Sequence, residues 1–407
     1  MDRPGGQMTG DVATGDQKIA WATAHMPVLA EIRSRFEREK PLAGVKLAGL
    51  LHIEPKTAVF ALVLRAGGAD LRLAAADLLS TDNDTVAALN AAGIPTLAQK
   101  GESIRDYHQN LAELVRFDPD VLLDDGGDLI AFAHETLPGR GRILGCTEQT
   151  TSGVTRLEAL VARGELRFPA LDVNDAQTKH LFDNRIGCGL STLDGLFATT
   201  NLLIAGSVCV VAGFGWVGKG VAPRLRSLGA EVILTEINPI RALEARLDGF
   251  QVMPMIDAAP RADFLVTTTG SESVVREEHF KVLRDGCVIG NMGHFDAEIS
   301  KIELYRLAAR RRVVRPQVEE ITFEDGRRVY LLSEGRLLNL AAAQGHPVEI
   351  MDLSFSTHAL AVEYILRHQN DLPVAIHDIP REIALAVAGE ALHGLDVRID
   401  GIHPPDP

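Results

Sequence analysis

The 407-residue chain is poor in cysteine, in aromatic residues and in positive charge. Its four cysteines are widely spaced and form no Cys-x-x-Cys pair, so the sequence predicts neither a disulfide framework nor a zinc site, and it fits a reducing cytoplasm. Asp and Glu number 55 against 41 Lys and Arg, which gives a net charge of −14. This excess of negative charge disfavours nucleic acids and anionic membranes as partners.

The sequence also lacks an N-terminal hydrophobic targeting segment and a membrane span. Because the first residues are polar and rich in glycine, we expect residues 1–15 to be disordered, and residues 396–407 to form an irregular tail. Residues 195–217 carry no charge, but they include threonine, asparagine, serine and several glycines. This stretch is therefore predicted to be a helix end and a buried parallel strand.

What the chain does contain is a glycine turn between a predicted strand and a predicted helix. Residues 208–212 are apolar, Gly213, Gly215 and Gly218 follow, and Glu236 closes the next apolar run, 18 positions after Gly218. In dinucleotide-binding folds the glycines permit the tight turn, the approach of the pyrophosphate and the packing of helix on strand, while the acid binds ribose hydroxyls. The pattern predicts NAD rather than NADP, because a glutamate would repel a 2′-phosphate.

Apolar runs of strand length alternate with helical patterns along most of the chain. The predicted strands are residues 45–51, 70–74, 94–98, 121–125, 142–146, 208–212, 231–236, 263–268 and 287–291. Such alternation is typical of parallel, doubly wound sheets, and the length allows two domains. We predict an α/β protein with two Rossmann-like domains joined by a hinge and a short C-terminal helical segment. The substrate-binding domain would span residues 16–186, completed by 346–395, and the NAD-binding domain would span residues 187–345.

Polar clusters lie near the ends of several predicted strands. They are residues 52–54, 124–128 and 148–153, with Lys179 and Asp183 on a predicted helix. In an open α/β sheet, ligands bind beyond the carboxyl ends of the strands, so these clusters could converge on one crevice. Taken singly, each also fits an ordinary role as a capping residue, a turn or a surface ion pair.

Eight short segments occur together and in order. They are residues 52–58, 79–81, 124–129, 173–184, 213–220, 293–296, 334–340 and 345–347. In this combination the chain resembles the S-adenosyl-L-homocysteine hydrolase family over nearly its whole length, from about residue 20 to about residue 394. Lys56, Trp216 and residues 183–195 are most similar to the archaeal and thermophile branch of that family.

The resemblance implies an NAD-dependent hydrolase of one-carbon metabolism that reversibly cleaves S-adenosyl- or S-inosyl-homocysteine to a nucleoside and homocysteine. In that family NAD oxidises the sugar 3′-hydroxyl, a base removes the acidified C4′ hydrogen, the 5′ thiol leaves, water adds, and the ketone is reduced again. Closure about hinges near residues 187–189 and 344–346 would exclude water from the intermediate. The resemblance also implies a cytoplasmic homo-oligomer, a tetramer or a dimer.

The resemblance implies roles for individual residues as well. Catalytic roles fall to His52, Asp125, Lys179, Asp183, Cys188 and His294. Substrate contacts fall to Glu54, Lys56, Gln149, Asn174 and His346. Contacts with NAD fall to Thr150, Thr151, Ser152, Asn184, Gly213, Gly215, Trp216, Val217, Gly218, Glu236, Asn291 and Asn339. Among these, Lys179 and Asp183 would hold and deprotonate the 3′-hydroxyl, and a lysine needs a lowered pKa for such a role.

Some positions depart from the family pattern. Gln149 stands where the family usually has a glutamate that contacts the ribose hydroxyls, and Asp82 stands where it usually has a glutamine. Lys56 would donate a hydrogen bond where other members accept one from the adenine amino group, which suits a 6-oxo purine. Two alternatives therefore stay open beside the hydrolase. One is the same 3′-keto chemistry used to epimerise or oxidise a nucleoside or nucleotide sugar, and the other is a non-catalytic NAD-binding regulator.

Overall fold

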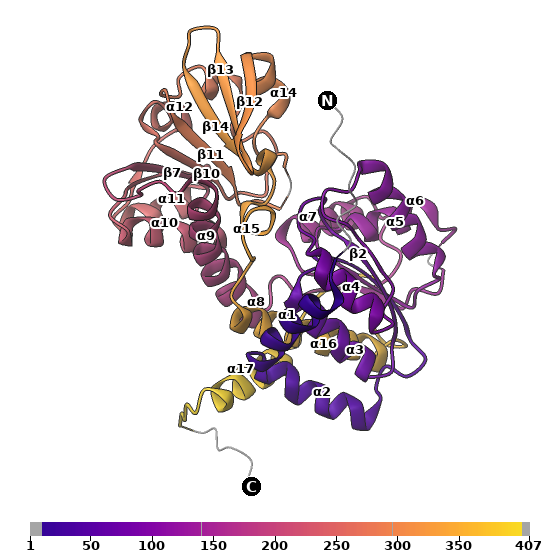
Figure 1. The fold of residues 1–407 in the computed structure, drawn as a ribbon. Coiled ribbons are helices and arrows are strands. Elements are labelled where there is room, and N and C mark those ends of the chain that lie inside the picture. The colour runs from indigo at the N-terminus through magenta and orange to yellow at the C-terminus, as the bar shows by residue number, and fades with distance from the viewer. Residues whose placement is uncertain (1–9, 140, 295, 401–407) are drawn as a thin grey trace. The chain divides into compact units, whose positions relative to one another are not determined.

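The computed structural model describes residues 10–139, 141–294 and 296–400, and the chain divides into two compact units (Figure 1). Unit 1 comprises the chain up to Lys179 and the segment from Val348 onward, and unit 2 runs from His180 to Pro347. The sequence placed the first junction after residue 186. It lies earlier because the π-helix η1 (His180–Gly187) packs on helix α10 of unit 2.

Unit 1 contains a seven-stranded sheet in the order β15-β6-β5-β4-β1-β2-β3, and every pairing in it is parallel. Its strands are β1 (Lys46–Leu51), β2 (Asp70–Ala75), β3 (Thr96–Leu97), β4 (Val121–Asp124), β5 (Gly145–Glu148), β6 (Ala170–Asp172) and β15 (Ile376–Asp378). The sheet is buried on both faces, as parallel sheets usually are. In β1, for example, Leu47 and Leu51 join one hydrophobic core, while Ala48 and Leu50 join the other.

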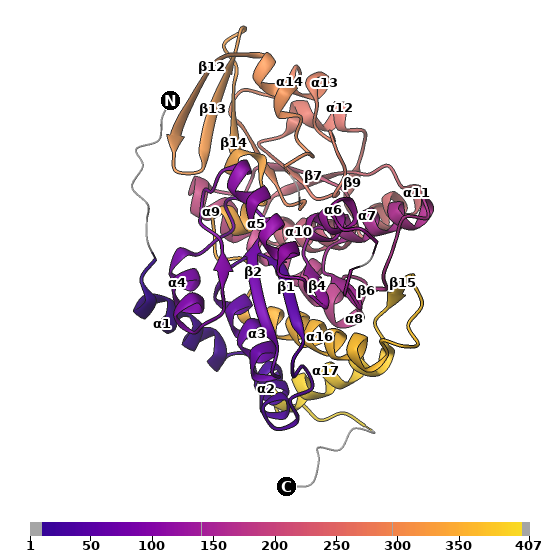
Figure 2. The ribbon, with the colours of Figure 1, turned by 90° about the vertical axis from the view of Figure 1, so that its right-hand side faces the viewer.

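Helices cover this sheet, and two of them come from the C-terminal segment. The helices of unit 1 are α1 (Val12–Ala24), α2 (Pro27–Glu39), α3 (Pro55–Ala66), α4 (Asn83–Ala91), α5 (Ile104–Arg116), α6 (Asp128–Thr136), α7 (Thr151–Ala162), α8 (Gln177–Lys179), α16 (Val348–Arg367) and α17 (Arg381–Gly394). Helix α16 packs on the helices α2 and α3, which are far away in sequence (Figure 2). Asp352 of α16 accepts hydrogen bonds from the backbone N–H groups of Val28 and Leu29 and so caps α2.

Several predicted elements of unit 1 need correction. Helix α1 begins at Val12, so the expected disorder is wrong for residues 12–15, because the Asp11 carboxylate accepts from the backbone N–H of Thr14 and caps the helix. The remainder of that prediction, for residues 1–9, and the tail from residue 401 lie outside the described residues. The strand expected at 142–146 is Gly145–Glu148, and the C-terminal segment expected to be helical includes the strand β15.

Unit 2 contains an eight-stranded sheet in the order β12-β13-β14-β11-β10-β7-β8-β9. Its strands are β7 (Val208–Ala212), β8 (Glu231–Thr235), β9 (Gln251–Val252), β10 (Phe264–Thr267), β11 (Cys287–Asn291), β12 (Ala308–Arg315), β13 (Val318–Phe323) and β14 (Arg328–Leu332). The pairings from β14 through β11 to β9 are parallel, as a Rossmann-like sheet requires. The orange strands β12 and β13 extend the sheet with antiparallel pairings, which the sequence did not predict (Figure 1).

Short helices connect the strands of unit 2. They are α9 (Cys188–Thr200), α10 (Trp216–Ser227), α11 (Pro239–Leu247), α12 (Met255–Ala258), α13 (Glu277–Phe280), α14 (Lys301–Arg306) and α15 (Leu338–Ala341), with the 3₁₀ turns η2 (Ala259–Arg261) and η3 (Ser333–Gly335). Helix α10 packs against α9 and η1. Among the helices of the described residues, none combines the length and the apolar character that crossing a membrane requires.

Candidate active site

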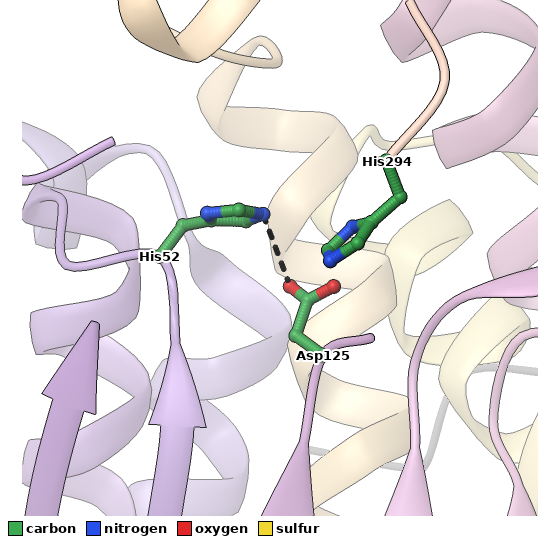
Figure 3. Close-up of side chains that lie close together, drawn as sticks. All are labelled: His52, Asp125 and His294. Atoms are coloured by element: carbon green, nitrogen blue, oxygen red, sulfur yellow. Dashed lines mark ion pairs between the residues drawn. The ribbon is translucent and has the colours of Figure 1, made fainter. Parts of the chain in front are cut away.

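In unit 1, His52 and Asp125 lie just beyond the carboxyl ends of the neighbouring strands β1 and β4. The His52 Nε2 atom is 3.8 Å from the Asp125 Oδ2 atom, and both side chains are largely buried (Figure 3). The other ring nitrogen, Nδ1, is 2.7 Å from the Ser80 Oγ atom. A histidine that is hydrogen-bonded at Nδ1 and has a carboxylate near Nε2 is oriented as a proton-transfer group needs to be.

Glu54 and Lys56 form a second pair at the start of α3. The Lys56 Nζ atom is 2.5 Å from the Glu54 Oε2 atom, and the two side chains are 6% and 12% exposed. Pro55 occupies the first turn of the helix, where its missing N–H leaves no hydrogen bond unmade. The pair therefore places an ammonium donor beside a carboxylate acceptor, shortly after the carboxyl end of strand β1.

Two buried carboxyl groups organise the loops that carry Asp125 and Thr150. The Glu148 Oε1 atom accepts from the backbone N–H groups of Gly126 and Thr150 and from the Thr150 hydroxyl. Asp124 accepts from the N–H groups of Asp125 and Ile130. Burial raises the pKa of Glu148 to about 7, and burial together with Glu148 raises the pKa of Asp124 well above its usual range. Asp124 and Glu148 lie in two of the predicted polar clusters, but neither had a predicted role of its own.

The loops after β5 and β6 carry Gln149, Thr150 and Asn174, and the short helix α8 that follows ends at Lys179. The Thr150 hydroxyl caps α7 by accepting from the Gly153 N–H. Asn174 Oδ1 lies 3.4 Å from the Lys179 Nζ atom, and both side chains are buried. Thr151 also contacts Asn174, whereas Ser152 contacts Thr150. These residues thus share one end of the unit 1 sheet with His52 and Asp125.

In unit 2, the glycine turn has the geometry that a dinucleotide requires. Gly213 has a φ of +98°, which favours glycine, and a side chain on Gly218 would overlap the Gly213 carbonyl oxygen. A side chain on Gly215 would meet only the Arg241 guanidinium at 3.7 Å, so the space over Gly215 is open to a ligand. The turn leads into α10 at Trp216, whose N-terminal N–H groups suit a pyrophosphate.

Glu236 and two asparagines complete this part of unit 2. The Glu236 carboxylate follows β8 and accepts from the backbone N–H groups of Phe214, Ile237 and Asn238, which fixes it beside the turn. Asn291 is buried at the end of β11 and accepts from the Gly293 N–H. Asn339 donates to the Ser191 hydroxyl, but its buried Oδ1 atom has no hydrogen-bond partner among the residues that the structure describes. This orphan acceptor and the open turn fit bound NAD.

A third group in unit 2 joins Asp183, Cys188 and His346. The His346 Nδ1 atom is 3.4 Å from Asp183 Oδ1, and the Nε2 atom is 3.3 Å from Cys188 Sγ. Burial alone would lower the pKa of His346, but Cys188 and Asp183 outweigh burial and raise this pKa to about 10. His346 is therefore protonated at neutral pH and can donate from both nitrogens.

The remaining predicted residues of unit 2 lie in η1 and in the loop after β11. Asn184 is buried within η1, and His294 lies half-buried in the loop after β11. His180, at the start of η1, stacks on Trp216 with ring centroids 4.4 Å apart. We predicted from the sequence that Lys179 and Asp183 lie on one helix. In the structure, Lys179 ends the single α-helical turn α8, and Asp183 lies in the wider π-helix η1 that follows.

The fold and these groups define a class of protein, a two-unit α/β enzyme that uses NAD and proton-transfer residues on a small molecule. Comparison with known proteins makes the assignment narrower. Residues 184–345 match the model of the S-adenosyl-L-homocysteine hydrolase NAD-binding domain, and residues 10–142 match the S-adenosyl-L-homocysteine hydrolase model. The chain belongs to the S-adenosyl-L-homocysteine hydrolase family and has that family's NAD-binding domain.

Relatives from distant organisms agree with this assignment. Adenosylhomocysteinase of Aquifex aeolicus is 50% identical and that of Sulfurisphaera tokodaii 48% identical, each over 95% of this chain and 93% of the relative. S-inosyl-L-homocysteine hydrolase of Methanocaldococcus jannaschii is 48% identical over the same shares. The crystal structure of a dipicolinate synthase polypeptide from Bacillus halodurans covers 80% of this chain and 99% of its own at 13% identity and a TM-score of 0.46, a likeness too low to inform function. The hydrolase names favour thioether hydrolysis over epimerisation.

Proposed function

We propose that this protein reversibly cleaves a purine-nucleosyl homocysteine, S-adenosyl- or S-inosyl-homocysteine, to the nucleoside and homocysteine through a 3′-keto intermediate. The observation that carries the proposal is the buried His52–Asp125 pair in a chain whose other unit has the family's NAD-binding domain. Bound NAD would supply the hydride acceptor and donor for the sugar 3′ carbon. The residues of the chain would supply binding, orientation and proton transfer.

In this proposal, the polar side chains at the edge of the unit 1 sheet bind the nucleoside. Lys179 and Asp183 hold the 3′-hydroxyl and take up its proton. His52 and Asp125 then move protons at C4′ and at the 5′ position, so that the C5′–S bond breaks, the thiol leaves protonated and water adds at C5′. Support comes from the burial of His52, Lys179 and Asp183 and from the low exposure of the Asp125 side chain, 14%, because a carboxylate or an imidazole shielded from water is a more effective proton-transfer group than an exposed one.

Unit 2 would hold the cofactor. The turn at Gly213, Gly215 and Gly218, with Trp216 and Val217, would contact the pyrophosphate, and Glu236 the adenosine ribose. Asn184, Asn291 and Asn339 would contact the nicotinamide half, together with Thr150, Thr151 and Ser152 of unit 1. Cys188, His294 and His346 would lie near the reacting atoms, and Asn174 and Gln149 would contact the sugar. The open space over Gly215 and the orphan acceptor of Asn339 support the cofactor contacts.

In this proposal, Glu54 and Lys56 bind the purine base of the substrate. A lysine ammonium only donates, so Lys56 favours a base with an acceptor at position 6, whereas the Glu54 carboxylate accepts from an amino group or a ring N–H. Because both groups are present as a pair, we expect adenosyl and inosyl substrates to be turned over, with Lys56→Thr reducing kcat/KM for the inosyl substrate more than for the adenosyl one.

The proposal is tested by thiol release. Purified protein containing NAD is mixed with each substrate and a thiol-reactive dye. The wild-type protein should release homocysteine from each substrate, and Asp125→Asn should release it at a strongly reduced rate. Arg33→Ala, an exposed substitution on α2, serves as the matched control and should match the wild type. Absence of thiol release from either substrate by NAD-containing wild-type protein would refute the proposed reaction.

We also propose that the protein is a homotetramer or a dimer in the cytoplasm. Apolar side chains of α11 and the loop before it, Ile237, Ile240 and Leu247, are 99%, 76% and 78% exposed in the single chain, as expected of a face that a second copy covers. All four cysteines are free thiols, which fits a reducing compartment. Light scattering on the NAD-containing protein tests the oligomer, and a monomeric mass would contradict it.

A further inference from the structure

His358, a buried residue of α16, belongs to no predicted site yet bridges two elements of unit 1. Its Nε2 atom is 2.6 Å from the Thr147 hydroxyl on β5, and its Nδ1 atom is 2.8 Å from the Gln149 Oε1 atom in the loop that follows. The ring also packs against Phe60, with ring centroids 5.0 Å apart. His358 is thus held on both nitrogens by residues at the edge of the sheet that carries His52 and Asp125.

The single proton of the Thr147 hydroxyl decides the tautomer of His358. The hydroxyl has two acceptors within reach, the His358 Nε2 atom at 2.6 Å and the Leu122 carbonyl oxygen at 3.5 Å. The short contact is a strong hydrogen bond and the long one is marginal, so Thr147 donates to Nε2. An Nε2 atom that accepts leaves the proton of a neutral imidazole on Nδ1. His358 therefore donates from Nδ1 to the Gln149 carbonyl oxygen.

The charge state of His358 agrees with this arrangement. Burial, with a smaller effect of Lys179 in the same direction, outweighs the opposing effect of Asp125 and lowers the pKa of His358 to about 3. The ring is therefore neutral throughout the pH range in which the protein would work, and the direction of its hydrogen bonds does not change within that range.

With its oxygen engaged, the Gln149 amide has only one way to face a ligand. The Nε2 atom donates one hydrogen to the Ser354 hydroxyl of α16 at 2.9 Å. An amide nitrogen carries two hydrogens, and within the described chain the second one has no acceptor. If the amide were reversed, its NH₂ group would face the Nδ1–H of His358, and two donors would oppose each other in a buried place.

We propose that His358 is a positioning residue that fixes the Gln149 amide with its free N–H toward the sugar of the substrate. Gln149 then donates to one sugar hydroxyl oxygen and recognises that oxygen as an acceptor. This inference rests on the proposed function for the identity of the ligand, a purine nucleoside, but not on turnover.

Two substitutions separate the roles of the two ring nitrogens. In His358→Asn the side-chain amide nitrogen can take the place of Nδ1 and donate to Gln149, whereas in His358→Gln the longer side chain reaches the position of Nε2 and leaves Gln149 Oε1 without its donor. Both variants keep a polar, neutral side chain at the same buried place. His134→Gln, at another buried histidine of unit 1, is the control for a general loss of stability.

The experiment uses calorimetry to measure binding of adenosine, 2′-deoxyadenosine and 3′-deoxyadenosine to protein loaded with NADH, which cannot oxidise the sugar. The lost hydrogen bond should weaken binding of one of the two deoxy analogues to wild-type protein roughly threefold to tenfold relative to adenosine. His358→Asn and His134→Gln should keep this discrimination, and His358→Gln should lose it. Equal discrimination by the Asn and Gln variants, or its loss in both, would overturn the proposal.

The tautomer gives a second readout that a purely structural role would not change. In protein labelled with ¹⁵N-histidine, the signal missing from His358→Asn identifies His358. We expect the wild-type ring to be neutral with the proton on Nδ1 between pH 6 and pH 9, and a ring protonated on Nε2 or on both nitrogens would overturn the proposal. Because neither measurement needs homocysteine release, a failure of the hydrolase reaction would be recognised separately.

Discussion

Asp124 on β4 and Glu148 on β5 are direct partners in the parallel register, and neither carboxyl group is exposed to solvent. Their oxygens accept hydrogen bonds from backbone N–H groups of the loops that carry Asp125 and Thr150, and these bonds fix the shape of the loops. The Glu148 Oε2 atom is buried and has no hydrogen-bond partner among the described residues, so a proton on Oε2 leaves the hydrogen bonds that Oε1 accepts intact. The pair thus couples the loops of the candidate active site to pH.

This coupling predicts a pH-dependent stability. Burial raises the pKa of Glu148 from 4.5 to about 7. Between these two pH values the folded protein therefore keeps a proton on Glu148 that the unfolded chain has released. The stability that Glu148 contributes is fully present below pH 4.5 and is lost as the pH rises to about 7. Glu148→Gln removes the titration, and its free energy of unfolding should therefore change less between pH 4.5 and 7 than that of the wild type.

Urea unfolding at several pH values measures this difference. Glu39→Gln, an exposed substitution on α2, is the control and should follow the wild type. Identical pH dependence of wild type and Glu148→Gln would show that Glu148 is already ionised in the folded protein.

The glycine turn predicts opposite outcomes for two similar substitutions. Gly218→Ala places a methyl group against the Gly213 carbonyl oxygen and should lower the free energy of unfolding by about 1–3 kcal/mol. Gly215→Ala meets no backbone atom, so the NAD-free protein should keep its stability while NAD binds at least about tenfold more weakly. Thermal unfolding with and without NAD distinguishes the two, and unchanged NAD affinity of Gly215→Ala would contradict the proposed approach of the pyrophosphate.

We expect a second pH dependence of the free energy of unfolding from His346, whose pKa is raised by neighbouring groups and not by burial. Its folded-state pKa of about 10 lies above the ordinary value of 6.5, because the attraction of Cys188 and Asp183 exceeds the effect of burial. The stability that this interaction contributes is fully present below pH 6.5 and is lost as the pH rises through about 10. Asp183→Asn should therefore lose less stability between pH 6.5 and 10 than wild type does. A decrease as large as that of the wild type would mean that Asp183 does not interact with a charged His346.

The cap that α16 provides for α2 predicts a purely structural effect. Asp352→Ala removes the acceptor for the N–H groups of Val28 and Leu29, and we expect a loss of about 1–2 kcal/mol in the free energy of unfolding. Glu349→Ala, at an exposed position one turn earlier, is the matched control and should stay within about 0.5 kcal/mol of the wild type. Equal stability of the two variants would show that the cap contributes nothing.

Much of the fold could be predicted because local patterns determine it. The strands β1, β4, β7 and β11 are apolar runs buried on both faces, and the turn at Gly213 needs glycine for reasons that the sequence makes visible. The antiparallel strand β12 escaped prediction because its residues, Ala308–Arg315, are mostly arginine and valine exposed at the edge of the sheet, without an apolar face.

The parts of the site that could not be predicted depend on tertiary contacts. His358 carries no local signal, since only the docking of α16 brings it to Thr147 and Gln149. The one indication is that four polar residues, Ser354, Ser356, Thr357 and His358, lie close together in α16, and all four are buried. The change to a π-helix at His180 likewise depends on packing against α10 rather than on local sequence.

The proposed reaction depends on proton abstraction from C4′, which solvent exchange measures without any other step of the cycle. NAD-containing protein is incubated with adenosine and, separately, inosine in heavy water without homocysteine, and the recovered nucleoside is analysed by mass spectrometry and NMR. We predict one deuterium at C4′, acquired at a rate that falls about 10²-fold or more in Asp125→Asn. Recovery of both nucleosides without deuterium at C4′, from protein shown to contain NAD, would contradict the account.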